Sequence, residues 1–378
     1  MKFETALVQA GERSVAGSGD VVAPLHLATT HERSPQDPVR FYYARGENPT
    51  RERLEACLSA LEGARYASVF SSGQAAAATL LSCFRASRRA VVGADVYSGT
   101  YGLLARSGLD VTYTDLADPS TALDVLGNGS DPIDLVWVET PGNPRLSVVD
   151  LETVCHLAHD RGALVVVDNT VASPALQQPL RWADVSLYSA TKSLSGHMDV
   201  LGGALVYQDD ALHAELREQR TLLGNVPGPF DCYSIRRGIK TLALRVERQC
   251  ATAMRLAAAL EEAPGVTEVL FPGLASHAGH EVASRQMAGY GSLIGFRYAG
   301  DVATALARVK CFAVAVSLGG VQSLIEHPAS MSHRSLPDDV IGQAKVSDDL
   351  VRVSVGIEHA DDLIDDLLSA LREGSEMS

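Results

Sequence analysis

The chain has 378 residues, enough for two or three domains, with 32 basic and 46 acidic side chains and a net charge of −14. A hydrophobic fraction of 46% beside 21% charged residues is ordinary for a protein with a large core, and it excludes disorder as the dominant state. The acidic balance also argues against non-specific binding to nucleic acid, because contact with a phosphate backbone requires a basic face.

The first residues lack the apolar run of a signal peptide. The longest uncharged stretch, Tyr66–Phe84, has the polar segment Ser71-Ser72-Gly73-Gln74 at its centre, which favours strand, turn and helix over a membrane span. The six cysteines are scattered and match neither a zinc ribbon nor a dense disulfide framework. We therefore expect a soluble, cytoplasmic protein with free thiols and no contact with membranes.

Short apolar runs alternate with helical patterns from about residue 66 to residue 207. Several runs are β-branched and apolar at successive positions, which is typical of strands covered on both faces. The expected strands are Tyr66–Phe70, Ala90–Val92, Val111–Thr114, Leu135–Val138, Ala163–Val167, Val185–Leu187 and Ala204–Val206. The expected crossover helices are Gln74–Phe84, Gly99–Ser107 and Leu151–Arg161. This alternation predicts an α/β fold with a mostly parallel central sheet.

The pattern changes after the turn-rich segment Gly224–Pro229. A long amphipathic helix over 238–262 is followed by further strand and helix patterns, which together predict a smaller α+β unit. These are strands Val266–Leu270, Ser292–Arg297, Ala313–Ser317 and Leu350–Val355, and a final helix Ala360–Arg372. We accordingly divide the chain into an N-terminal arm (1–55), a large domain (56–230) and a C-terminal domain (231–378).

Polar residues follow the expected strands at the edge of the sheet where parallel strands end and where ligands bind. A glycine turn at Ser71–Ala75 opens a helix and offers free amide groups to an anion, Asp168 ends another strand, and Lys192 follows a third. The sequence has neither a P-loop nor a G-x-G-x-x-G motif, so a nucleotide is a less favoured ligand for this edge. Pyridoxal phosphate needs all three features, since the lysine forms a Schiff base and the acid keeps the ring nitrogen protonated. Spacing alone leaves other ligands open.

Eight segments, in order, carry a resemblance to a known family. They are Tyr43–Arg51, Asp95–Tyr101, Glu139–Pro144, Val167–Thr170, Tyr188–Lys192, Gly196–Asp199, Ser317–Val321 with Glu326–Met331, and Leu350–Gly356. Over nearly its whole length the chain resembles the cystathionine and methionine metabolism family of fold-type I pyridoxal phosphate enzymes. The resemblance implies the fold-type I transferase fold and an active enzyme rather than a cofactor-binding protein without turnover.

The resemblance also implies roles for individual residues. Lys192 would bond the cofactor and move protons on the substrate, and Asp168 would be the partner of the ring nitrogen. Tyr97 would stack on the ring and protonate the leaving thiol. The phosphate would be held by backbone amides and hydroxyl groups, those of Gly73, Gln74, Ser189 and Thr191.

Further roles concern the substrate and a second subunit. Arg352 would clamp the substrate carboxylate, because its planar fork fits that group, with Asn143 and Ser317 assisting. Tyr43 and Arg45 resemble a pair that reaches the phosphate of the neighbouring subunit, which implies a homotetramer built from dimers that share their active sites. Two histidine pairs lack the acids or cysteines of a metal site, so we expect none.

Family members are β-lyases, γ-lyases or γ-replacement synthases. The chain looks most like the γ-lyases, which convert methionine, homocysteine or cystathionine into 2-oxobutanoate, ammonia and a thiol. A synthase that joins an activated homoserine ester to a thiol is the alternative. Gln322 stands where the family usually has a glutamate facing the distal end of the substrate, which favours a smaller substrate than cystathionine. Gly99 stands where typical methionine γ-lyases carry a cysteine, and Glu47 replaces a common glycine.

Overall fold

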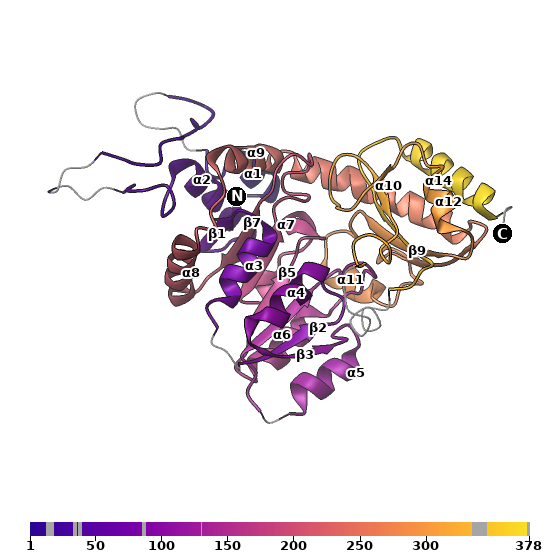
Figure 1. Cartoon of the computed structure of the whole chain (residues 1–378), viewed down its shortest axis with the longest axis horizontal. Coiled ribbons are helices and arrows are strands. Elements are labelled where there is room, and N and C mark those ends of the chain that lie inside the picture. The colour runs from indigo at the N-terminus through magenta and orange to yellow at the C-terminus, as the bar shows by residue number, and fades with distance from the viewer. Residues whose placement is uncertain are drawn as a thin grey trace.

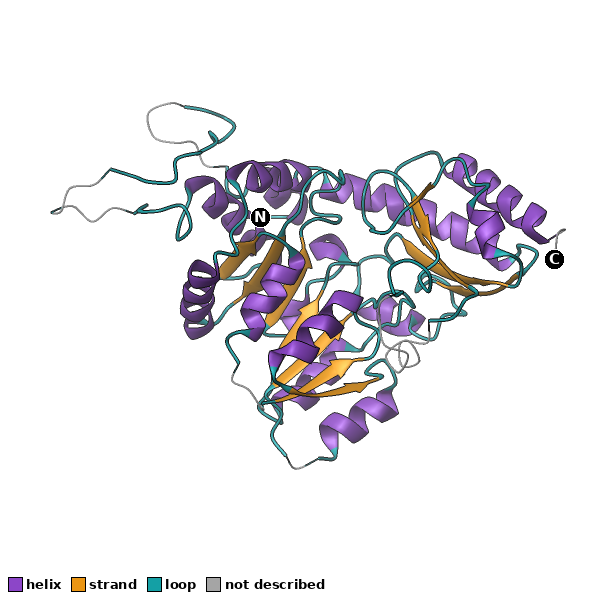
Figure 2. Ribbon diagram, viewed as in Figure 1, coloured by secondary structure: helices purple, strands orange, loops and turns teal. Residues whose placement is uncertain are grey.

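The computed structural model describes residues 1–12, 19–32, 36, 40–84, 88–129, 131–334 and 346–375. A seven-stranded sheet forms its large domain, with strand order β1-β7-β6-β5-β4-β2-β3 (Figure 2). The strands are β1 Tyr66–Phe70, β2 Arg89–Gly93, β3 Asp110–Thr114, β4 Leu135–Glu139, β5 Leu164–Asp168, β6 Val185–Ser189 and β7 Gly203–Tyr207. Only β7 runs antiparallel to its neighbours, so the mostly parallel sheet is confirmed, as are all seven expected strands.

Successive residues of the central strands face opposite sides of the sheet, and both sides are covered. Trp137 of β4 packs in the cluster that includes α3, α4 and α8, whereas Val136 and Val138 pack against α6. This explains why the central strands are apolar at every position. The helices of the large domain are α3 Gly73–Leu81, α4 Ser98–Ser107, α5 Pro119–Ala122, α6 Leu151–His159, α7 Ser173–Leu176 and α8 Asp210–Leu223. Short helical turns lie at Leu123–Gly127 and Pro179–Arg181.

The long helix expected over 238–262 is confirmed as α10 Leu242–Glu261, and α9 Pro229–Ile239, which the sequence does not predict, precedes it. The chain turns between them, and Arg245 donates to the carbonyl of Gly238 and to the hydroxyl of Thr241. The first turns of α10 pack in the core of the large domain and its later turns in that of the small domain, so α10 joins the two (Figure 1). The proposed boundary at residue 230 stays a prediction.

The small domain is a second sheet covered by helices, with strand order β10-β11-β12-β9-β8. Its elements are β8 Val266–Leu270, α11 His280–Gln286, β9 Leu293–Tyr298, α12 Val302–Leu306, β10 Ala313–Val314, β11 Leu324–Glu326, β12 Leu350–Ser354 and α14 Ala360–Ser375. The sequence does not predict the three-residue β11. The strand expected to reach Ser317 ends at Val314, because the chain then turns through a positive φ at Ser317.

The N-terminal arm contains helix α1 Phe3–Gln9, which the sequence does not predict, and leads into α2 Pro49–Glu62 (Figure 1). Asn48 caps α2 by accepting hydrogen bonds from the amides of Thr50 and Arg51. No helix within the described residues is long and apolar enough to cross a membrane. All six cysteines are free thiols, and the described part of the chain holds no cluster of potential metal ligands.

Candidate active site

A cavity of about 480 Å³ lies at the carboxyl ends of β4, β5 and β6, where the small domain meets the sheet. Every site residue expected from the sequence lines it, except Tyr43 and Arg45. The expected residues that line it are Gly73, Gln74, Tyr97, Asn143, Asp168, Ser189, Thr191, Lys192, Ser317 and Arg352. Segments that are distant in the sequence and come from both domains therefore meet in one place.

The N-terminus of α3 forms an anion cradle at one end of the cavity. The hydroxyl of Ser72 accepts from the amide of Ala75 at 3.0 Å and so caps the helix. The two amides between these residues, those of Gly73 and Gln74, have no described partner. A Cβ on Gly73 would lie 3.0 Å from the Cβ of Ser189, so glycine allows this close approach of helix and strand. Free amides beside the positive end of a helix dipole suit a phosphate group.

The two hydroxyl-bearing residues expected at the cradle differ in their contacts. Ser189 lines the cavity, and its amide is held by the hydroxyl of Thr170 at 2.8 Å. The hydroxyl of Thr191 accepts from the amide of Gly202 at 3.0 Å and donates to its carbonyl at 3.3 Å. Thr191 thus fixes the loop that follows Lys192, and its contact with a phosphate stays a prediction.

Two buried carboxyl groups lie side by side at the ends of β4 and β5, where Glu139 is paired with Asp168 in the strand register. Burial raises the pKa of Asp168 to about 6, although its carboxylate accepts from the amide of Thr170 at 3.0 Å. Burial, and then the charge of Asp168, raise the pKa of Glu139 well above its ordinary value. A protonated ring nitrogen beside Asp168 would give this buried carboxylate a cationic partner and would favour its ionised form.

The amine of Lys192 projects into the cavity and donates to the hydroxyl of Ser317 at 2.8 Å. Burial, followed by the charge of Arg352, lowers the pKa of the lysine to about 8. The free amine is therefore partly neutral near physiological pH, which a nucleophile towards an aldehyde must be.

Arg352 on β12 is buried, and neighbours hold most of its guanidinium group. Nη1 donates to Oδ1 of Asn143 at 2.8 Å and lies 3.0 Å from a carboxylate oxygen of Glu326, while Nη2 donates to the carbonyl of Ser317 at 2.8 Å. Nε has no partner among the described residues. A buried donor without a partner is costly, and Arg352 lines the cavity, so a substrate carboxylate that reached this edge of the fork would satisfy it.

Tyr97 stands at the N-terminus of α4, where the residue is 43% exposed and forms part of the cavity wall. Its amide donates to Glu139 at 2.7 Å, which links the tyrosine to the carboxyl pair. A Cβ on Gly99 would lie 2.5 Å from Cε1 of the Tyr97 ring, so a cysteine here would have to displace that ring. Glycine at this position therefore has a structural reason.

Tyr43 and Arg45 lie outside the cavity of their own chain. Arg45 donates to the carbonyl of Thr221 at the end of α8 at 2.7 Å, and its guanidinium lies 5.7 Å from the centre of the Tyr43 ring. The neighbouring Glu47 forms an ion pair with Arg217 of α8, which accounts for an acid at that position. Their contact with a second subunit stays a prediction.

Sequence reasoning assigned no role to Glu139, Glu326 or Thr170, although all three act on site residues. Glu139 carries the signal that identified Asp168, namely an acid at the end of a buried apolar strand. Glu326 begins the family segment Glu326–Met331, but no strand-end pattern marks it, since it lies on β11, which the sequence does not predict. Gln322 is exposed and is not part of the cavity wall, so the argument about substrate size stays a prediction.

Comparison with known proteins identifies the family. Residues 4–372 match the family described as Cys/Met metabolism PLP-dependent enzyme. The chain belongs to this family. A cystathionine gamma-synthase from Mycobacterium tuberculosis is 45% identical, with 97% of this chain and 96% of that protein covered. A cystathionine gamma-lyase from Dictyostelium discoideum is 39% identical, with 98% of this chain and 97% of that protein covered.

Solved structures are similar over the whole chain. A protein from Micromonospora echinospora is 53% identical, covers 98% of this chain and 99% of its own, and superposes with a TM-score of 0.94. It is named a cystathionine gamma-lyase in that structure and a methionine gamma-lyase in another, with a TM-score of 0.92. The chain is thus a fold-type I enzyme that uses pyridoxal phosphate, and its anion cradle, buried acid and buried amine fit that cofactor.

Proposed function

We propose that the enzyme is a carbon–sulfur γ-lyase. It would convert methionine, homocysteine or cystathionine into 2-oxobutanoate, ammonia and a thiol. The observation that carries this choice among the family's reactions is the 53% identity with the Micromonospora echinospora protein, named for two γ-lyase activities. The cavity also supports this proposal, because Arg352 in its wall can bind the single carboxylate of a small amino acid substrate.

The chain's own residues would divide the chemistry as follows. Bound pyridoxal phosphate supplies an electron-withdrawing ring that stabilises negative charge on substrate carbon. Arg352 holds the substrate carboxylate, and Asp168 keeps a proton on the ring nitrogen. Lys192, with its lowered pKa, accepts the proton of the substrate Cα and returns protons to carbon. The hydroxyl of Tyr97 donates a proton to the departing sulfur.

The γ-replacement synthase is the competing function, and the 45% identity with the Mycobacterium tuberculosis enzyme supports it. Both reactions need the residues described above, and they differ in whether water or a thiol completes the turnover. We also propose that the enzyme works in the cytoplasm as a homotetramer in which Tyr43 and Arg45 complete the phosphate site of a neighbouring subunit.

A substrate panel distinguishes the two functions. The holoenzyme is incubated separately with methionine, homocysteine and cystathionine, and 2-oxobutanoate is measured, with Lys192→Ala as the inactive control. A γ-lyase releases the keto acid from at least one of them. The lyase assignment is wrong if none is released and an activated homoserine ester with cysteine instead gives cystathionine.

The Gln322→Glu variant tests the preference for a smaller substrate. A carboxylate at this exposed position outside the cavity wall should attract the distal ammonium of cystathionine at long range and raise turnover of cystathionine relative to methionine by less than about tenfold, since exposed charges are screened. The measurement is the ratio of kcat/KM for the two substrates. An unchanged ratio would remove Gln322 from the determinants of specificity.

A further inference from the structure

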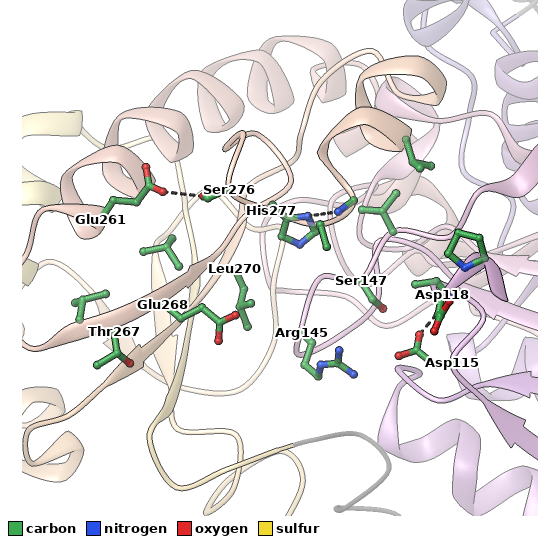
Figure 3. A pocket seen from close by; sticks show the side chains of 18 residues that line it. Asp115, Asp118, Arg145, Ser147, Glu261, Thr267, Glu268, Leu270, Ser276 and His277 are labelled. Atoms are coloured by element: carbon green, nitrogen blue, oxygen red, sulfur yellow. Dashed lines mark hydrogen bonds between the residues drawn. The ribbon is translucent and has the colours of Figure 1, made fainter. Parts of the chain in front are cut away.

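A second cavity, of about 730 Å³, lies between the large and small domains, away from the residues of the catalytic cavity. One wall comes from the large domain, through 115–119 and the loop 145–148. The other comes from the small domain, through the end of α10, β8 and the segment leading into α11. Figure 3 shows labelled side chains from both walls around Arg145. Neither the proposed reaction nor any residue that serves it uses this space.

Arg145 supplies a positive charge to the wall of this cavity. It is half-buried, and no described residue forms a hydrogen bond or ion pair with its guanidinium group. In Figure 3 it lies between Asp115 and Glu268. Glu268 instead accepts from Arg297 at 2.8 Å. Burial raises the pKa of Asp95 and the charge of Arg145 partly offsets this, but no described acceptor is bonded to the arginine fork, so these donors are available to a ligand.

The acidic residues of the wall determine which charges a ligand of this cavity must carry besides one that suits Arg145. Glu261 accepts from Ser276 at 2.8 Å, and Asp118 from Ser120 at 2.9 Å, so each is already held in place. Burial lowers the pKa of His277, which leaves it neutral near pH 7. A simple anion would be repelled by the surrounding carboxylates, and a simple cation by Arg145. A ligand that carries both charges satisfies both requirements.

Apolar side chains complete the wall between these charges. They are Val148 of the large domain, with Val269, Leu270 and Val282 of the small domain. We propose that this cavity binds a free α-amino acid with an apolar side chain. Its carboxylate bonds to Arg145, and its ammonium group faces Oε1 of Glu268, since Oε2 already accepts from Arg297. Its side chain lies against the valines and Leu270. The ligand contacts both domains.

The loop that carries Arg145 also reaches the catalytic cavity. Asn143, two residues earlier, holds Arg352. Ser147, two residues later, donates its hydroxyl to the buried Asp95 at 2.6 Å, and Asp95 immediately precedes Val96 and Tyr97. An amino acid bound at Arg145 would therefore lie beside the segments that position Arg352 and Tyr97.

Equilibrium dialysis of the holoenzyme with radiolabelled L-norleucine tests the proposal. Norleucine has an apolar side chain and no sulfur to eliminate, so it is not consumed, whichever sulfur reaction the enzyme catalyses. We expect two molecules bound per chain in the wild type. One should be lost in Arg352→Ala, the catalytic-cavity variant, and the other in Arg145→Ala, with an affinity drop of at least tenfold.

Two further variants keep the test decisive. Arg145→Lys retains the charge without the planar fork and should weaken the second site less than alanine does. Arg285, which pairs with Asp150 on the surface near α11, provides a matched control, and Arg285→Ala should leave both sites intact. Binding of only one molecule per wild-type chain, or two undiminished sites in Arg145→Ala, would overturn the proposal.

Discussion

The buried ion pair behind the substrate site gives the sharpest test of the structural reasoning. The side chain of Glu326 is fully buried and that of Arg352 is 4% exposed, with 3.0 Å between the paired atoms. In Glu326→Ala the guanidinium stays buried, but its remaining hydrogen-bond acceptors, Asn143 and the carbonyl of Ser317, are neutral. Removing one partner of such a pair costs about 3–5 kcal/mol, because a charge is left uncompensated away from water.

Chemical denaturation of the apoprotein measures this loss as the change in the free energy of unfolding. The matched control is Asp361→Ala, which removes an ion pair with Arg255 whose side chains are 57% and 55% exposed. We expect this control to lose less than about 1 kcal/mol, since surface pairs are screened by water. A double variant, Glu326→Leu with Arg352→Met, should be more stable than Glu326→Ala. If Glu326→Ala loses no more than Asp361→Ala, the burial argument is wrong.

Two further predictions concern the cofactor site. Because burial raises the pKa of Asp168 to about 6 while the unfolded chain titrates near 4, the folded apoprotein keeps a proton that the unfolded chain loses. The contribution of Asp168 to stability should therefore fall by about 3 kcal/mol as the pH rises from about 4 to about 6, and Asp168→Asn should remove that slope in unfolding measurements across this range. In Gly203→Ala the new methyl group would overlap the carbonyl of Ser72 and displace the anion cradle. Cofactor affinity should then fall at least tenfold, which corresponds to the loss of about one charge-assisted hydrogen bond. Titration of the apoprotein with pyridoxal phosphate measures this affinity. Gly102→Ala on α4, where the nearest atom is 3.8 Å away, is the control and should bind normally; equal affinities would contradict the role of Gly203.

The sequence by itself determined the large domain because its signals are local. Strands covered on both faces must be apolar at successive positions, so all seven were visible in the chain, and the polar residues after them marked the edge of the sheet where the site lies. The family motifs then named the residues of the catalytic cavity. The signals did not reveal the three-residue β11 or the helix α9 that precedes α10.

Only the tertiary structure decided which groups are buried together and which remain without a partner. No pattern in the sequence places Glu326 behind Arg352, pairs Glu139 with Asp168, or shows that the Tyr97 ring fills the space beside Gly99. The second cavity likewise exists only where two domains meet around Arg145. Local propensity and spacing fix the elements and their ends, whereas burial, charge pairing and cavities arise from contacts between residues that lie far apart along the chain.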